Sequence, residues 1–65
     1  METFHVTQFV AGDEVVLDTK DKAAEACQEA LKQIRSGKTG ISVMGTERGI
    51  IAFQNEEGRL QSTGN

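Results

Sequence analysis

The sequence predicts a small, two-layer α+β domain, with one helix packed on a small antiparallel sheet in the order β-β-α-β-β. Apolar residues within 21–36 recur at the three- and four-residue spacing that places side chains on one face of a helix. Short runs of alternating β-branched and aromatic residues lie on both sides of that segment. Because helix and strands each have an apolar face to cover, we expect the helix to lie across the sheet. The helical stripe consists of Ala23, Ala24, Cys27, Ala30, Leu31 and Ile34.

Residues 3–10 and 15–17 are expected to form the first hairpin. Residues 11–14 join them as a three- or four-residue turn, in which Gly12 can adopt a positive φ. In the first strand the even-numbered side chains point to one face of the sheet, and they include the apolar Phe4, Val6 and Val10. This face is the natural choice to lie under the helix, and Phe9 lies on the opposite face.

The helix has sequence signals at both ends. Gly37 is suited to a left-handed stop after the last turn. Before the first turn three residues are competent N-caps, and the sequence does not choose among Asp18, Thr19 and Asp21.

A second hairpin is expected after the helix. Ile41 and Val43 share one parity of its first strand, and Ile50 and Ala52 share one parity of its second. A further edge strand over 59–61 is an option, and the last residues are expected to be frayed. The expected segments are strands 40–45 and 49–54, turns 45–49 and 55–58, and a frayed end at 62–65.

A second apolar face is the least ordinary feature of the pattern. A sheet that is half exposed to water should alternate strictly, yet Phe9 and Met44 oppose the covered parity and residues 50–53 are apolar on both parities. One interpretation is that short, twisted strands tolerate exposed apolar side chains. The other is that a second chain buries part of this face or a strand edge, where Phe9, Met44 and either Ile50 or Ile51 would lie.

Length and composition favour the second interpretation. The 65 residues suffice for a single domain, 1–65, and a chain this short buries only about 60% of its unfolded surface. Cys27 is the only cysteine and His5 the only histidine, which leaves no internal disulfide and no compact Cys/His metal site. Small domains are commonly stabilised by disulfides, by metals or by self-association, and self-association is the one that remains for this chain.

The charge and the N-terminus bear on partners and location. The net charge of −3 argues against nucleic acid as a partner, because duplex binding requires basic residues on one face. The sequence shows no secretory signal, which would have a basic segment followed by an apolar one, and no apolar run long enough to span a membrane. We therefore expect no membrane partner. A lone cysteine fits a reducing compartment, and the expected location is cytoplasmic.

No motif for catalysis, metal or cofactor binding is found. Residues 36–39, Ser-Gly-Lys-Thr, resemble the end of a phosphate-binding loop, but Lys32 stands where that motif requires glycine. The segment also follows a helix, whereas a phosphate-binding loop precedes one. Cys27 on the apolar helix face is expected to be buried and inert, and His5 to lie at the surface or an interface. The carboxylates near 13–21 are expected to serve capping and solubility.

These observations predict a cytoplasmic, non-enzymatic protein-interaction module (a regulator, adaptor or inhibitor) that acts as a homodimer and also binds another protein. The turn at 45–49 is open to two interpretations, a plain turn or a recognition loop. The alternative function is a nucleotide- or nucleic-acid-binding accessory protein with a basic patch of Lys32, Arg35, Lys38 and Arg48. The predicted interface residues are Phe9, Met44, Thr46, Glu47, Arg48 and Ile50.

Overall fold

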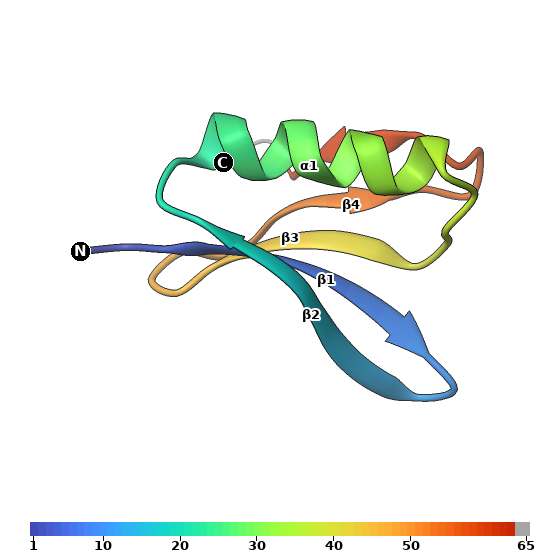
Figure 1. The fold of residues 1–65 in the computed structure, drawn as a ribbon, viewed down its shortest axis with the longest axis horizontal. Helices are drawn as coiled ribbons and strands as arrows, with labels where there is room; N and C mark the ends of the chain where they lie inside the picture. Colours follow the sequence, from blue (N-terminus) through green and yellow to red (C-terminus); the bar gives the residue numbers. More distant parts are fainter. Residues whose placement is uncertain (64–65) are drawn as a thin grey trace.

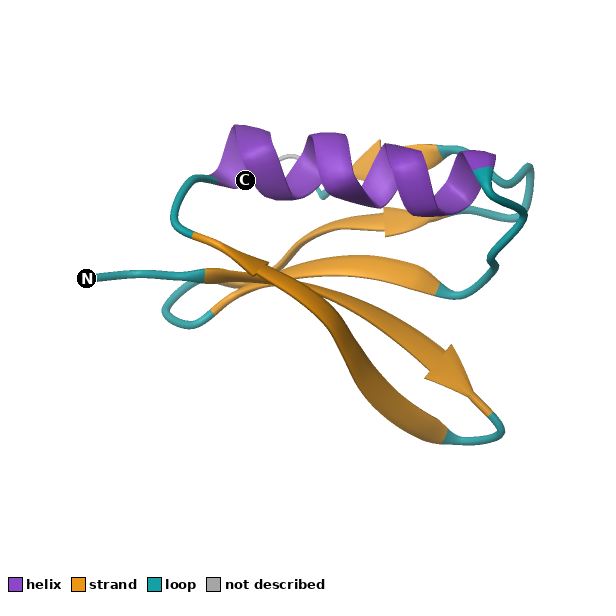
Figure 2. Cartoon of the chain, viewed as in Figure 1, coloured by secondary structure: helices purple, strands orange, loops and turns teal. Residues whose placement is uncertain are grey.

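The computed structural model describes residues 1–63 and confirms a two-layer α+β fold (Figure 1). Its one helix lies across a single sheet, as the purple and orange layers of Figure 2 show. The predicted order is confirmed, and a fifth short strand follows the second hairpin. The elements are β1 (Phe4–Val10), β2 (Asp13–Lys20), α1 (Ala23–Arg35), β3 (Ile41–Gly45), β4 (Gly49–Gln54) and β5 (Leu60–Ser62).

All five strands pair antiparallel in the order β2-β1-β3-β4-β5. The helix leaves β2 at one edge and returns the chain to β3, which pairs with the far side of β1. β1 and β3 are therefore the strands under the helix, while β2 and β5 form the two edges.

The core lies between α1 and the middle of the sheet. Val6, Ile41 and Val43 are at most 1% exposed, and Ala26 and Ala30 meet them from the helix with no exposed surface. Burying a valine or isoleucine side chain completely contributes about 1.5–3 kcal/mol, and burying the methyl group of an alanine contributes less. Further residues surround this centre, with Cys27 half-buried rather than fully buried. They are Phe4, Leu17, Ala23, Cys27, Ile34, Ile51, Ala52 and Leu60.

The helix starts later than the sequence indicates. Lys22 occupies the N-cap position with an extended backbone and makes no side-chain capping hydrogen bond. Of the three predicted caps, Asp18 and Thr19 belong to β2, and Asp21 precedes the N-cap residue. The prediction was wrong because β2 stays paired with β1 as far as Lys20, and this pairing outweighs the local capping preference.

The helix stops where the sequence indicates. Gly37 has a φ of 98°, its N–H donates to the carbonyl of Ile34 at 3.0 Å, and the N–H of Lys38 donates to that of Gln33 at 3.3 Å. This pair of bonds is the Schellman motif, which satisfies carbonyls left free at a helix end.

The turn between β1 and β2 has two residues rather than three or four. Ala11 and Gly12 have φ values of 53° and 85°, which are typical of the type I′ turn that suits the twist of a hairpin. Val10 pairs directly with Asp13, so β2 is eight residues long instead of the predicted 15–17.

Bulges in β2 and β4 change which side chains face the helix. In β4 the extra residue is Ile51, so that Ile50 pairs with Met44 while Ala52 pairs with Val43. Ile50 and Ala52 therefore lie on opposite faces of the sheet, although the sequence parity had placed them together. An extra residue reverses the alternation of every residue that follows it.

The C-terminal residues that the structure describes are held to the sheet. Ser62 ends β5, and both the N–H and the hydroxyl of Thr63 donate to the carbonyl of Ile51, at 3.1 and 3.3 Å. The expected fraying therefore does not apply to residues 62 and 63, and residues 64–65 lie outside the described residues.

Candidate interaction surface

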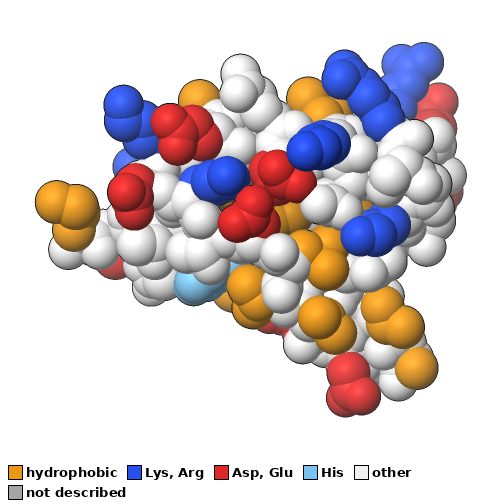
Figure 3. All heavy atoms as spheres, viewed as in Figure 1, with side chains coloured by type: hydrophobic (Ala, Val, Ile, Leu, Met, Phe, Trp, Pro, Cys, Tyr) orange, Lys and Arg blue, Asp and Glu red, His pale blue; other side chains and the backbone are white. Residues whose placement is uncertain are grey.

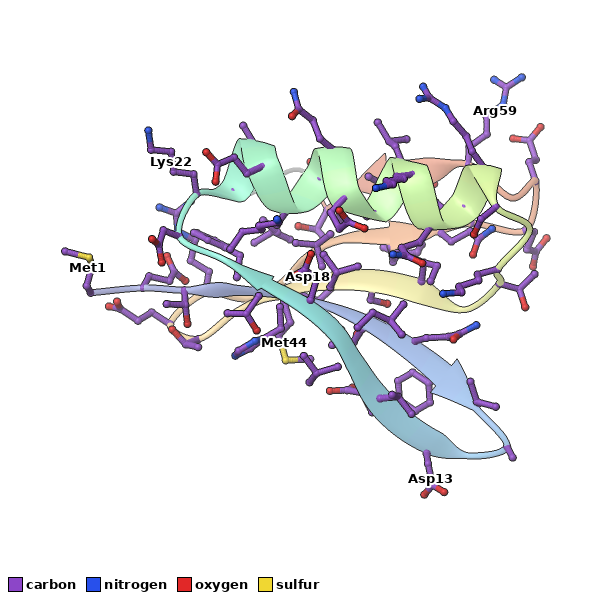
Figure 4. The ribbon with its side chains drawn as sticks, in the orientation of Figure 1. Met1, Asp13, Asp18, Lys22, Met44 and Arg59 are labelled. Carbon is purple, nitrogen blue, oxygen red and sulfur yellow. The ribbon has the colours of Figure 1, made fainter. Side chains whose placement is uncertain are left out.

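One face of the sheet has no helix over it, and we call it the open face. Strand register places on it the residues that alternate with the buried ones, because paired residues in an antiparallel ladder share a face. Figure 4 shows Met44 on the side of the sheet away from α1. The open face consists of His5, Thr7, Phe9, Glu14, Val16, Thr19, Ser42, Met44, Ile50, Phe53 and Gln61.

Much of the open face is apolar and in contact with water. Phe9 and Val16 are both 55% exposed and Ile50 is 49% exposed, while Met44 and Phe53 are half-buried. The three predicted interface residues Phe9, Met44 and Ile50 thus share one face, and the bulge at Ile51 decides between Ile50 and Ile51, which the sequence left open. Apolar surface gathered on one face of a small domain is typical of a protein contact.

The open face is also nearly free of charge. Among the strand residues that register places there, Glu14 is the one carboxylate, and there is no lysine or arginine. A charge-poor centre is the compositional mark of protein interfaces, whereas nucleic-acid surfaces are strongly basic.

Polar side chains also lie among the apolar ones on the open face. His5 and Thr19 form a cross-strand hydrogen bond, with 2.9 Å between Nδ1 and Oγ1. The hydroxyl of Thr7 is buried, with no hydrogen-bond partner among the described residues. His5 is half-buried on the open face, which agrees with its expected position at the surface or an interface.

The loop Thr46–Arg48 is fastened to the N-terminus. The carboxylate of Glu2 accepts hydrogen bonds from the N–H groups of Glu47 and Arg48, at 3.1 and 2.8 Å, and from Arg48 Nε at 2.9 Å. Thr46 exchanges two further bonds with the backbone of Thr3. Thr46 and Arg48 therefore have partners inside the chain, while the exposed side chain of Glu47 is available to a partner.

The tip of the first hairpin bends away from the helix (Figure 1), and we call residues 9–16 the arm. Figure 3 shows apolar side chains along it and an acidic side chain at its end. Val10 and Val15 lie on the helix side of the arm, yet they are 48% and 45% exposed. Val10 was expected under the helix, and that prediction was wrong because the twisted hairpin diverges from the helix toward its tip, so that α1 does not cover it (Figure 1).

The structure divides the predicted basic patch. Lys32, Arg35 and Lys38 lie at the C-terminal end of α1, whereas Arg48 lies in the β3–β4 loop at the other end of β3, with Glu2. Lys38 Nζ donates to Gln33 Oε1 at 2.7 Å. The three residues at the helix end remain a local cluster, and the alternative function that uses the patch stays a prediction.

Asp18 is one acidic residue of the 13–21 region with a definite structural role. Its Oδ1 accepts the N–H of Thr19 at 2.8 Å, and Oδ2 lies 3.4 Å from Lys20 Nζ. The Thr19 N–H, with a smaller contribution from Lys20, holds the pKa of Asp18 below its ordinary value. This carboxylate serves the bulged end of β2 rather than the helix N-terminus.

Residues 1–63 contain no pocket and no cluster of three or more potential metal ligands. Within the same residues, no helix has the length and hydrophobicity needed to cross a membrane. Comparison of the chain with protein-family models, with curated proteins and with solved structures finds no match.

Proposed function

We propose that this chain is a small, non-enzymatic protein-interaction module that acts as a homodimer and uses the open face of its sheet as a contact surface. The observation that supports the proposal is the exposed, charge-poor apolar surface of Phe9, Val16 and Ile50, with the half-buried Met44 and Phe53 on the same face. Each exposed apolar side chain that a partner removes from water favours binding by roughly 25 cal/mol per Å² of surface buried.

As part of the proposal, the protein works in the cytoplasm as a regulator, adaptor or inhibitor. The free thiol of Cys27 is compatible with a reducing compartment. The small size of the buried core also supports self-association, since a second chain would cover apolar residues that α1 leaves exposed.

The test is to place a charge on the open face and measure both self-association and partner capture. Met44→Glu and Ile50→Glu should each weaken at least one of these, because a buried carboxylate without a partner is strongly unfavourable. Gln28→Glu, at an exposed position of α1, adds the same charge away from the open face and is the matched control.

Self-association is measured by light scattering over a dilution series, and capture by affinity purification with each variant as bait. We expect the control to behave as the wild type in both measurements. If both face variants keep the wild-type mass and capture the same proteins, the open face is not a contact surface and the proposal fails.

A further inference from the structure

The arm exposes apolar side chains on both of its sides. Phe9 and Val16 lie on the open side and Val10 and Val15 on the helix side, all between 45% and 55% exposed. A two-stranded hairpin is marginally stable in water without a layer packed against it. The helix side of the arm is therefore a second uncovered surface, separate from the rest of the open face.

The charges at this end of the molecule are divided between two places. The acids Asp13 and Glu14 lie at the tip of the arm, and the cations Lys32, Arg35 and Lys38 lie at the end of α1. Among the described residues, none of these five side chains takes part in an ion pair within 4.0 Å. Lys32 still interacts electrostatically with Asp18 at longer range, and each group as a whole remains exposed to a partner of the opposite sign.

The two groups lie at the same end of the molecule but on opposite sides of it. Figure 1 shows the arm descending below the sheet at the end where α1 terminates above it, and Figure 4 shows Asp13 at the tip of the arm. The N–H of Phe9 donates to the carbonyl of Gly40 at 3.0 Å, which joins the base of the arm to the segment that follows α1. The β4–β5 turn at this end adds Arg59 together with Glu56 and Glu57, so cations still outnumber acids on the helix side.

From this arrangement, we propose that the arm is the contact between two copies of the chain. A two-fold axis at this end of the molecule brings the acidic tip of each copy to the basic helix end of the other. The same rotation brings the helix sides of the two arms together, so that Val10 and Val15 of each copy meet those of the other. A two-fold contact suits a surface that carries both partners of every charge pair.

This inference rests on the proposed function, because it requires the homodimer, and it deepens that function by assigning the self-contact to the arm. The two open faces then point away from the axis, and most of their apolar surface stays free for a different protein. One chain thus provides one surface for its own copy and another for a partner.

The experiment is a charge exchange measured by light scattering across a dilution series. A tip variant combines Asp13→Lys with Glu14→Lys, and a helix-end variant combines Lys32→Glu with Arg35→Glu. We expect each to raise the dimer dissociation constant at least tenfold, and a variant that carries all four changes to return to within about threefold of the wild type, since exchanged charges attract again. The matched control is Asp21→Lys, an exposed acid at the opposite end of the helix, with no effect on the constant.

Circular dichroism establishes that each variant is folded, and if the helix-end variant does not fold, the tip variant and its control decide the test. If the tip variant has the dimer dissociation constant of the wild type, the arm contact is overturned. It is overturned as well if the variant with all four changes binds more weakly than either two-residue variant, because exchanged charges should then attract again. A wild type that is monomeric at all concentrations overturns both the arm contact and the homodimer. If Ile50→Glu dissociates the dimer and the tip variant does not, the arm contact fails while the proposed function stands.

Discussion

At the residue scale, the side chains that depart from their usual environments are Ala11 and Thr7. Ala11 has a φ of 53°, in the left-handed region that L-residues with a Cβ avoid. Thr7 places a hydroxyl in a buried site without a partner among the described residues. Neither property is visible in the sequence, because alanine is not a turn residue and threonine is an ordinary strand residue.

Ala11→Asn should stabilise the protein. Asparagine tolerates the left-handed conformation, and Asn-Gly is the preferred pair for a type I′ hairpin turn. Relief of the strain at Ala11 should raise the free energy of unfolding by about 1 kcal/mol. Denaturant unfolding followed by circular dichroism measures this change. Gly12→Ala, which puts a Cβ at a φ of 85°, should lower the free energy, and a loss of stability in Ala11→Asn would contradict the assigned turn.

Thr7→Val should also stabilise the protein, by about 1 kcal/mol, because it removes a buried hydroxyl that has no partner while keeping the shape of the side chain. The same unfolding measurement applies. Thr19→Val is the comparison, since it removes a hydroxyl that bonds to His5 and should bring no gain. Destabilisation by Thr7→Val would show that the hydroxyl has a partner in solution.

At the element scale, the contact between the N-terminal segment and the β3–β4 loop determines the shape of one end of the molecule. The carboxylate of Glu2 is only 12% exposed and joins two backbone N–H groups and the side chain of Arg48. Gly45 leaves the space for it, because a Cβ on Gly45 would lie 2.5 Å from Glu2 Oε2. Residues more than forty positions apart thus form one structural unit.

Glu2→Gln should loosen this unit. The amide keeps the size of the side chain but loses the charge that strengthens its bonds to Arg48 and to the loop N–H groups. Because Arg48 is largely exposed, we expect a loss of only about 1 kcal/mol in the free energy of unfolding. Amide hydrogen exchange should become faster at Glu47 and Arg48. Glu47→Gln, which changes an exposed carboxylate in the same loop, should leave both measurements unchanged.

The elements themselves were predictable to different degrees. The helical segment and its stop at Gly37 depend on local spacing and on one glycine, so the sequence was sufficient to locate them. The predicted apolar stripe was wrong in part, because Ala24 and Leu31 are exposed and the fully buried Ala26 was not among its residues. The length of β2 and the bulge at Ile51 depend on pairing with distant strands, and local preferences were misleading there. Asp18 and Thr19 have the composition of a helix cap, yet the ladder with β1 places them in a strand.

The same contrast applies to the candidate surface. The alternation of side chains across a strand was enough to select Phe9 and Met44, whereas the bulge at Ile51, which alternation cannot predict, is what puts Ile50 on the same face. Alternation also did not find the arm, since its exposure follows from the bend of the two paired strands away from the helix, which leaves Val10 and Val15 uncovered.

At the scale of the whole molecule, charge and apolar surface are separated. The cations lie on the helix side and at the chain turns, while the open face has a single carboxylate among its strand residues. A molecule of this design can present an apolar face to a partner and still remain soluble through the helix side. Self-association through the arm should weaken as the salt concentration rises, because salt screens the exposed charges at the arm tip and the helix end.

If two copies pair as proposed, thermal stability should depend on protein concentration. A dimer that dissociates on unfolding gains stability by mass action, so the midpoint of thermal unfolding should rise by about 3–6 °C for each tenfold increase in concentration. Circular dichroism at several concentrations measures it. The tip variant with Asp13→Lys and Glu14→Lys should show a much smaller rise, and added salt should reduce the rise in the wild type by screening the paired charges. A midpoint independent of concentration in the wild type would show that the folded chain is stable without a second copy, and it would remove the thermodynamic reason for the homodimer.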